Sequence, residues 1–361
     1  MSPDPASRRP RRPRRGFLLP MVLLSLLLVA SLSAATQFGA WRATRAARLA
    51  WNGERATHAA DEALSMVVSA WQPGLFAARA IGERWAQSVV TGDGAVVSVA
   101  LVRTAPLALV AMAHATSKVS GASDTASRRI VRALALHGPT FPVRGAVTSI
   151  GALAIDTGAE VDGRDAVSAV DGCGSTRDTL SITAVHGGAV SVDMGASLSG
   201  SATVVAPGLG SPLNMADQTA FGTAWNESSA RTSEVRHVAA GAPLVASAAW
   251  HSIRVVGNDT VVSSAVVLDA TSTHDGLLLV DGDLVVRGKL VVRGLLVVRG
   301  ALDVVGGSLD VLGAVIVGGR GAGSSRLGPG TRVRYSPCTM RRAMAAVSRP
   351  GRAPFGHWIP R

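Results

Sequence analysis

A long uncharged apolar run near the N-terminus is the strongest pattern in the chain. It extends from Phe17 to Ala35, and its 19 residues come close to the length that an α-helix needs to cross a bilayer. Six arginines precede it: Arg8, Arg9, Arg11, Arg12, Arg14 and Arg15. Because positive charge stays on the cytoplasmic side, we expect residues 1–16 to form a basic cytoplasmic leader and the chain after Thr36 to be exported.

The helical pattern does not stop at the end of this run. From Gln37 to Trp71, apolar residues recur mostly at three- and four-residue steps. Asn52-Gly53 weakens the pattern locally, and Pro73-Gly74 ends it. The sequence therefore predicts one helix of roughly 55 residues over 17–72, half in lipid and half standing above the membrane.

Alternating apolar and polar positions replace the helical pattern after the proline. Residues 92–104 and 106–116 read as two strands, and residues 126–138 as a third strand or a short helix. A trio of strands packed on the exported half of the long helix would form a small α+β unit over 75–138.

The next region and the C-terminal tail are less regular. Residues 139–265 are rich in Ser, Thr, Gly and Val, which predicts short strands, with a short helix within 218–236. Residues 320–361 form a basic tail, largely irregular apart from an expected strand at 331–335 and an expected helix at 338–347.

A hexad repeat occupies residues 266–319. Its glycines recur with a period of six, at 276, 282, 288, 294, 300 and 306. Six is even, so each unit keeps the same side chains inward, Leu and Val on one face and Arg287, Arg293 and Arg299 on the other, mixed face. Short strands with glycine at each turn favour a solenoid-like stack, with a flat meander as the alternative. The parity shifts by one residue after Gly306-Gly307, which predicts a bulge or a corner there.

Taken together, these patterns predict an α+β protein. It has a long N-terminal transmembrane helix, a β-rich globular part and a C-terminal solenoid-like β-repeat. Few aromatic residues (4%) and 40 glycines agree with short strands and tight turns rather than a helical bundle.

The chain is strongly basic, with a net charge of +12. Nine arginines and no acid follow Gly319. Such a surplus could attract a polyanion such as DNA or polysaccharide, and the arginines of the repeat could offer it a basic surface. The alternatives are solubility for the overall charge and a solvated strand face for the arginines, which lack interleaved aromatic residues for stacking on bases.

Candidate chemistry is sparse. Cys173 and Cys338 are the two cysteines, and in an oxidising compartment a disulfide between them is favoured over two buried thiols. The eight histidines are scattered, which supports no metal site, and no nucleophile or acid–base constellation is visible. We therefore expect no cofactor and a non-enzymatic protein.

Arg15-Gly16-Phe17 followed by an apolar helix resembles the leader and N-terminal helix of type IV pilin-like proteins. The resemblance implies that a prepilin peptidase cuts between Gly16 and Phe17. The fifth residue after the cut is usually Glu in major pilins, and here it is Met21. This departure suits the accessory or minor, PilX-like group.

Other segments resemble PilX-like proteins in the same order along the chain. They are GERATHAADEAL at 53–64, AEVDGRD at 159–165 followed by Cys173, the glycine repeat at 276–300 with GAVIVGG at 313–319, and RYSPCTMRRAM at 334–344. The resemblance implies an accessory component of a type IV pilus or a related secretion pseudopilus. It would sit in the inner membrane with its N-terminus inside, and would pair with other pilin-like subunits and the assembly machinery.

Two other readings remain open. Ser33-Ala34-Ala35 is an acceptable cleavage site for an ordinary signal peptide, which would make the chain a secreted or surface β-solenoid adhesin. A third reading is an uncleaved membrane protein that polymerises through the ends of its solenoid. The mature N-terminus, Phe17 or Thr36, separates the first two.

Overall fold

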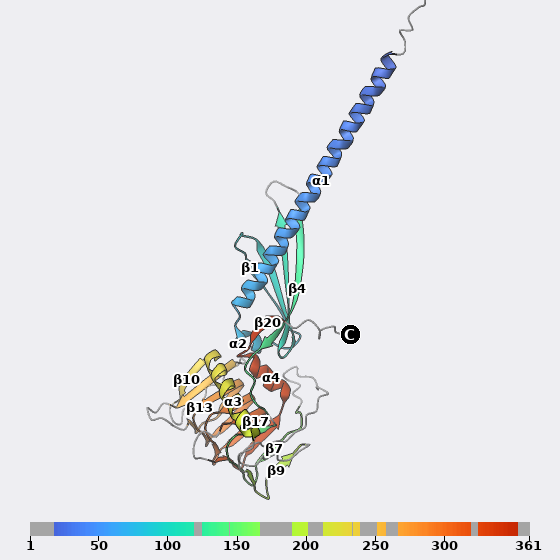
Figure 1. Cartoon of the computed structure of the whole chain (residues 1–361). Helices are drawn as coiled ribbons and strands as arrows, with labels where there is room; N and C mark the ends of the chain where they lie inside the picture. The colour runs from blue at the N-terminus through green and yellow to red at the C-terminus, as the bar shows by residue number, and fades with distance from the viewer. Residues whose placement is uncertain are drawn as a thin grey trace, which may run out of the picture.

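The computed structural model describes residues 18–118, 125–143, 145–166, 190–200, 212–232, 234–238, 251–257, 266–318 and 324–352. The molecule is α+β. A long straight helix carries an antiparallel sheet on its second half, and a β-rich body lies beyond that sheet, at the end away from the free half of the helix (Figure 1).

The helix α1 runs without interruption from Leu18 to Ser69, 52 residues. The predicted long helix is thus confirmed, and Asn52-Gly53 does not break it. It ends before Pro73, which instead opens the short helix α2 (Pro73–Ala78), where proline is tolerated because the first turn needs no N–H donor. From Leu19 to Trp51 every side chain is exposed, and burial begins at Asn52.

An antiparallel sheet in the order β1-β2-β3-β4-β20 packs on the second half of α1. Its strands are β1 (Arg84–Val90), β2 (Val96–Ala105), β3 (Ala108–Lys118), β4 (Thr125–His137) and β20 (Arg349–Arg352). Residues 126–138 therefore form a strand, which decides between the two predictions for that segment. The helix buries a mainly alanine face, Ala56, Ala59, Ala60 and Ala63, against the sheet. These small side chains let the helix lie close to the strands.

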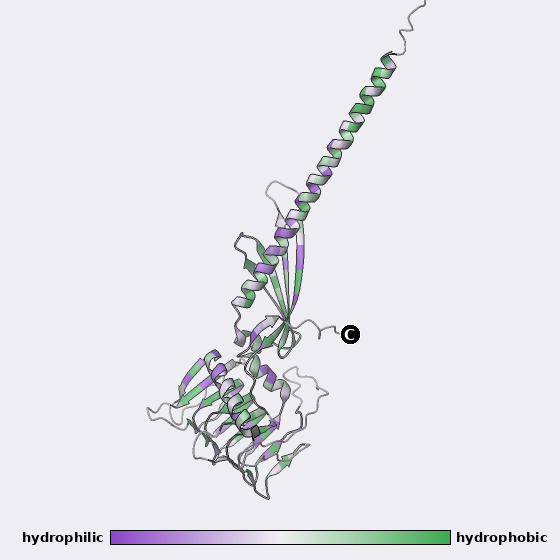
Figure 2. Cartoon of the chain, in the orientation of Figure 1, coloured by the Kyte–Doolittle hydropathy of each residue, from purple (hydrophilic) through white to green (hydrophobic). Residues whose placement is uncertain are grey.

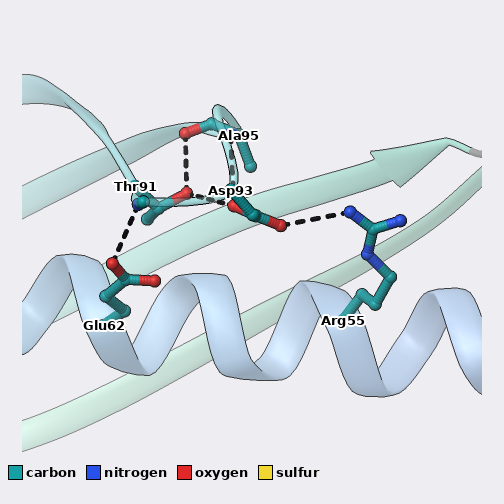
Figure 3. A network of polar contacts seen from close by, with 6 residues as sticks. Arg55, Glu62, Thr91, Asp93 and Ala95 are labelled. Carbon is teal, nitrogen blue, oxygen red and sulfur yellow. Dashed lines mark hydrogen bonds and ion pairs between the residues drawn. The ribbon is translucent and has the colours of Figure 1, made fainter.

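Polar contacts fix the turn between β1 and β2 to the helix (Figure 3). The Gly92 N–H donates to the Glu62 carboxylate at 2.9 Å, and Arg55 pairs with Asp93 at 3.3 Å. The Thr91 hydroxyl donates to the same Asp93 at 2.6 Å, which orients the carboxylate toward the helix. Next to Glu62 in the helix, Asp61 pairs with Arg132 of β4. The adjacent acids Asp61 and Glu62 thus hold the sheet onto α1.

The β-rich body consists of two stacks of parallel strands, and every strand pair described in it is parallel. The larger stack contains β10 (Glu234–Val238), β11 (His251–Gly257), β13 (Ser272–Asp281), β15 (Lys289–Val298), β17 (Ser308–Val317), β19 (Thr331–Tyr335), β7 (Glu160–Asp162) and β9 (Ser197–Ser199), with β5 (Val147–Ser149) on β17. The smaller stack contains β12 (Val266–Leu268), β14 (Leu284–Val286), β16 (Leu302–Val304), β18 (Ser325–Leu327), β6 (Leu153–Ile155) and β8 (Val190–Val192). An antiparallel meander is therefore excluded for the described strands.

The register shows how the hexads are used. Leu284 pairs with Leu302 and Gly276 with Gly294, each 18 residues on, so neighbouring strands of a stack are three hexads apart. The inward leucines and valines of the repeat are fully buried between the stacks. After Gly306, whose φ is +68°, the spacing becomes 19, as in Lys289 with Ser308. The parity shift predicted at the glycine pair is confirmed as a corner that takes one extra residue.

The second half of each long strand is buried on both faces. Leu295 and Val297 of β15 are fully buried on the side where the sequence suggested a mixed, solvated face. They pack in one cluster with Phe221 and Trp225 of α3 (Pro212–Arg231) and with Ala343 of α4 (Pro337–Ala345). The prediction of a solvated outer face is thus right only for the half of each strand that carries arginine.

The C-terminal segment is more ordered than its composition suggested. The expected strand and helix appear as β19 and α4, and β20 then returns to the helical end and pairs with β4. The Trp71 indole N–H donates to the Ser348 carbonyl at 3.1 Å, beside this return. The tail therefore ties the β-rich body to the helix and its sheet.

Candidate functional site: the exposed helix, the arginine ladder and the joint

Residues 19–51 of α1, which we call its free half, are all exposed among the described residues, and this half begins with the apolar run. Most of its large apolar side chains are more than half exposed, for example Leu19 at 73%, Leu27 at 73% and Leu32 at 66%. An 18-residue window has a mean hydropathy of 2.1 with none of it buried, so this helix is long and apolar enough to cross a membrane (Figure 2). Each such side chain would gain about 1.5–3 kcal/mol by leaving water. Transfer of this half into lipid or against other helices would therefore be favourable.

The predicted processing residues precede this half of α1. Gly16 and Phe17 lie outside the described residues, and the helix is already formed at Leu18. The helix also runs straight through Ser33-Ala34-Ala35, the alternative cleavage segment.

Two of the three arginines proposed as a basic surface belong to the larger stack: Arg293 lies within β15, and Arg299 directly follows it. Arg287 lies in the turn between β14 and β15. Arg293 makes two hydrogen bonds to Asp275, at 2.8 and 2.7 Å, and Arg299 pairs with Asp281 at 2.7 Å. Arg287 is exposed, and no ion pair joins it to a described residue. We call the pairs of Arg293 and Arg299, together with Arg254–Asp281, the arginine ladder.

The ladder joins strands that neighbour each other in the stack. Asp275 and Asp281 stand 18 residues before Arg293 and Arg299, which is the spacing of paired strands. Burial by itself raises the pKa of Asp281, but hydrogen bonds from Arg299 and Arg254 outweigh it and hold that pKa below its ordinary value. Two of the three predicted arginines thus have their charge compensated within the protein, which weakens the field offered to a polyanion.

We expect Asp281→Asn to destabilise the β-rich body by about 2 kcal/mol, because two guanidinium groups lose a charged partner. Since the pKa of Asp281 is lowered in the fold, this contribution is present above the ordinary carboxylate range and is lost as the pH falls below about 4. Thermal unfolding of the full chain at pH 7 and pH 3 measures both effects. Asp310→Asn is the control, since its pair with Arg334 is more exposed and should contribute less than about 1 kcal/mol. Equal losses for both variants at pH 7 would contradict the assignment.

Cys338 lies in the first turn of α4, is 7% exposed and is disulfide-bonded. Cys173 lies outside the described residues, so the Cys173–Cys338 pairing stays a prediction. Peptide mapping with and without reductant tests it.

A pair of buried arginines forms the joint between the helix–sheet unit and the β-rich body. Arg103 of β2 is completely buried, and its guanidinium donates to the carbonyl oxygens of Phe76, Ala77 and Arg79 at 3.3, 3.1 and 2.5 Å. It also donates to the carbonyls of Ala105 and Pro106. We use "joint" for Arg103, Arg342 and the α2 carbonyls that they bind.

Arg342 of α4 completes the joint from the other body. It is 6% exposed and donates to the carbonyls of Ala77 and Ala78, at 3.2 and 3.4 Å. The last carbonyls of a helix have no partner inside it, so these cations supply what α2 lacks. Burial and the nearby Arg342 lower the pKa of Arg103 to about 9, which leaves it charged at neutral pH.

Sequence reasoning missed the joint, although one signal was present. Arg103 follows the inward-facing Val97, Val99 and Leu101 at the same two-residue spacing, so the alternation already placed a charge in the core. Within the described ranges, no group of three His, Cys, Asp or Glu side chains could hold a metal ion.

Comparison of the chain with protein-family models, with curated proteins and with solved structures finds no match.

Proposed function

We propose that this chain is a pilin-like accessory component of a type IV pilus or a related secretion pseudopilus, anchored and assembled through α1. The observation that carries the proposal is the division of one unbroken helix. Its first half is apolar and bare, and its second half packs on an antiparallel sheet. A bilayer covers the first half before assembly, and helices of neighbouring pilin-like subunits cover it in the fibre.

The helix offers those neighbours a close-packing surface just beyond the apolar run. Gly39, Ala43, Ala46, Ala47 and Ala50 share one side of α1, and all are exposed. Small residues on one side allow two helix backbones to approach closely, whether in a membrane or in a fibre core. This surface lies N-terminal to the first buried residue of the helix, Asn52, so it does not compete with the contact to the sheet.

The β-rich body is the displayed part. We interpret its two stacks of parallel strands as coils of a β-solenoid, three hexads to a coil over the repeat. The body stands at the end of the molecule away from the apolar half (Figure 1). In a fibre whose core is the helix, it would be at the surface or the tip, where Arg287 and other exposed residues could meet a ligand.

The mature N-terminus tests this function. We expect a prepilin peptidase to cut before Phe17, so mass spectrometry of the protein from the producing cell should find Phe17 first. Gly16→Val should block the cut and the assembly of the chain into fibres. The control Ala35→Leu should alter neither.

An N-terminus at Thr36 would instead support the surface or secreted adhesin, since the whole apolar run would then be removed. Fibre assembly unaffected by deletion of the gene, together with an N-terminus other than Phe17, would overturn the proposed function.

A further inference from the structure

Residues from the last turn of α1, from α2 and from β1 line one cavity, near the lower end of the helix in Figure 1. Its volume is about 470 Å³, within the range of about 300–1,000 Å³ that small-molecule sites occupy. Trp71, Phe76 and Trp85 supply aromatic rings to its wall, and Gln72 and Gln87 supply side-chain amides. We call these five residues and the space that they line the tryptophan pocket.

The aromatic rings of the wall are held in place by the fold. The ring centroids of Trp71 and Phe76 lie 5.1 Å apart and those of Phe76 and Trp85 lie 6.1 Å apart, both in tilted pairs. The bond from the Trp71 indole N–H to the Ser348 carbonyl also occupies the one polar group of that ring. Both tryptophans stay partly exposed, so a ligand would meet a preformed surface of apolar rings.

The two amides are the polar side chains of the wall that can serve a ligand. Gln72 and Gln87 are exposed, and neither side-chain amide makes a hydrogen bond with a described residue. Gln87 points to the same side of the sheet as Trp85, because these residues of β1 stand opposite the inward-facing Val99 and Leu101. An amide both donates and accepts hydrogen bonds. The pair therefore suits hydroxyl groups, which do the same.

The charge of the wall narrows the class of ligand. Among the described residues that line the pocket, only Arg79 is charged. It already pairs with Glu83 at 2.6 Å, and its guanidinium lies over the ring of Trp85, 5.7 Å from the centroid. A charged ligand would lose its hydration here without gaining a free partner of opposite charge. A wholly apolar ligand would cover the two amides and leave them unpaired.

We infer that the tryptophan pocket binds a neutral oligosaccharide. A pyranose ring has an apolar face of C–H groups and a rim of hydroxyl groups. The apolar face lies on the indole of Trp71 or Trp85, and the hydroxyl groups exchange hydrogen bonds with Gln72 and Gln87. The inference depends neither on the membrane span nor on the pilus, because the pocket lies outside the free half of α1.

The test titrates maltohexaose, cellohexaose and chitohexaose separately into the full-length chain. The chain is held in lauryldimethylamine oxide, a detergent without a sugar headgroup that could compete. Calorimetry measures the affinity, and we expect at least one of the three sugars to bind. Gln87→Leu should weaken that binding about fivefold, because a hydroxyl group loses its hydrogen-bond partner. Trp85→Leu should weaken it about tenfold or more, because the ring face is lost.

Each variant has a matched control. Ser88→Leu controls for Gln87→Leu, since Ser88 is exposed on the same strand but stands opposite Ser98 and points to the other side of the sheet. Trp51→Leu controls for Trp85→Leu, since Trp51 is 65% exposed on the free half of α1. Both controls should keep the affinity of the wild type. Gln87→Leu changes an exposed side chain, so it should also keep the unfolding temperature of the wild type.

Three results would overturn the inference. The first is that none of the three sugars binds, or that only an anionic polysaccharide such as heparin does. The second is that a sugar binds and both pocket variants keep the affinity. The third is that Ser88→Leu or Trp51→Leu loses as much affinity as its pocket counterpart. None of these results bears on the mature N-terminus, so the proposed function and the sugar site stand or fall separately.

Discussion

Replacing Gly313 with alanine is expected to destabilise the β-rich body by at least about 4 kcal/mol, far beyond an average substitution. Its φ is +145°, a region that side chains other than hydrogen rarely adopt. A Cβ there would stand 1.7 Å from the carbonyl oxygen of Gly294 on the next strand. The Gly294 oxygen and the Gly313 Cα belong to the backbones of adjacent strands inside the stack, so neither can move away from the contact.

Gly313 belongs to a row of three paired glycines, which we call the glycine row, in the β-rich body. Gly276, Gly294 and Gly313 are paired in register across β13, β15 and β17. At Gly294 an added Cβ would meet the Gly276 carbonyl at 2.1 Å and the Ala343 Cβ of α4 at 2.9 Å. The glycine row therefore lets the strands lie close together and lets α4 pack on them. It also marks the point at which each strand changes from one buried face to two.

Gly306→Ala is the matched control for this prediction. Its φ is also positive, at +68°, but no atom lies within 4 Å of the added Cβ. We expect a cost of about 1 kcal/mol there, from the backbone conformation alone. Thermal unfolding of the full chain in detergent, with hydrogen exchange of the β15 and β17 amides, measures both variants. A similar loss of protection in the two would show that close approach between strands is not the cause.

The sequence was sufficient for elements whose pattern is carried by neighbouring residues. The long helix followed from its apolar run and its three- and four-residue steps, and the corner at Gly306 followed from a change in parity. The hexad alone could not show which strands pair, because successive units are nearly identical and only the closed structure places Leu284 on Leu302. Strand β20 has the sequence RPGR, without alternation, and forms because β4 offers it a partner.

The candidate sites divide in the same way. The arginines of the repeat could be placed on one face from the period of six, but their compensation by Asp275 and Asp281 depends on strands three hexads apart. The joint depends on contacts across more than two hundred residues, from Ala77 to Arg342. No local pattern encodes a contact between residues so far apart in the sequence. The inward position of Arg103 nevertheless indicated that hydrogen-bond acceptors must surround its guanidinium in the core.

Arg103→Met is therefore the substitution that we expect to loosen the joint between the helix–sheet unit and the β-rich body. Methionine fills much of the volume but donates no hydrogen bond, so the five carbonyl oxygens that Arg103 serves would lose a donor in a buried site. We expect a loss of about 3–5 kcal/mol, since removing one partner of a buried polar contact costs more than the contact itself contributes. Arg103→Lys should recover only part of this, because an ammonium has three donors and no planar fork.

The effect should be local as well as large. In hydrogen exchange, the amides of α2 and of residues 79–82 should lose protection in Arg103→Met, while the centre of β15 keeps it. Arg84→Met, at the exposed start of β1, is the matched control and should change neither the unfolding temperature nor the exchange of α2. Unchanged α2 protection in Arg103→Met would show that Arg342 alone secures the joint. If instead the joint loosens as expected, α1 could anchor the chain while the β-rich body lost its fixed direction from the helix. Under the proposed function, a subunit with that defect would assemble normally and fail only in what its distal end contacts.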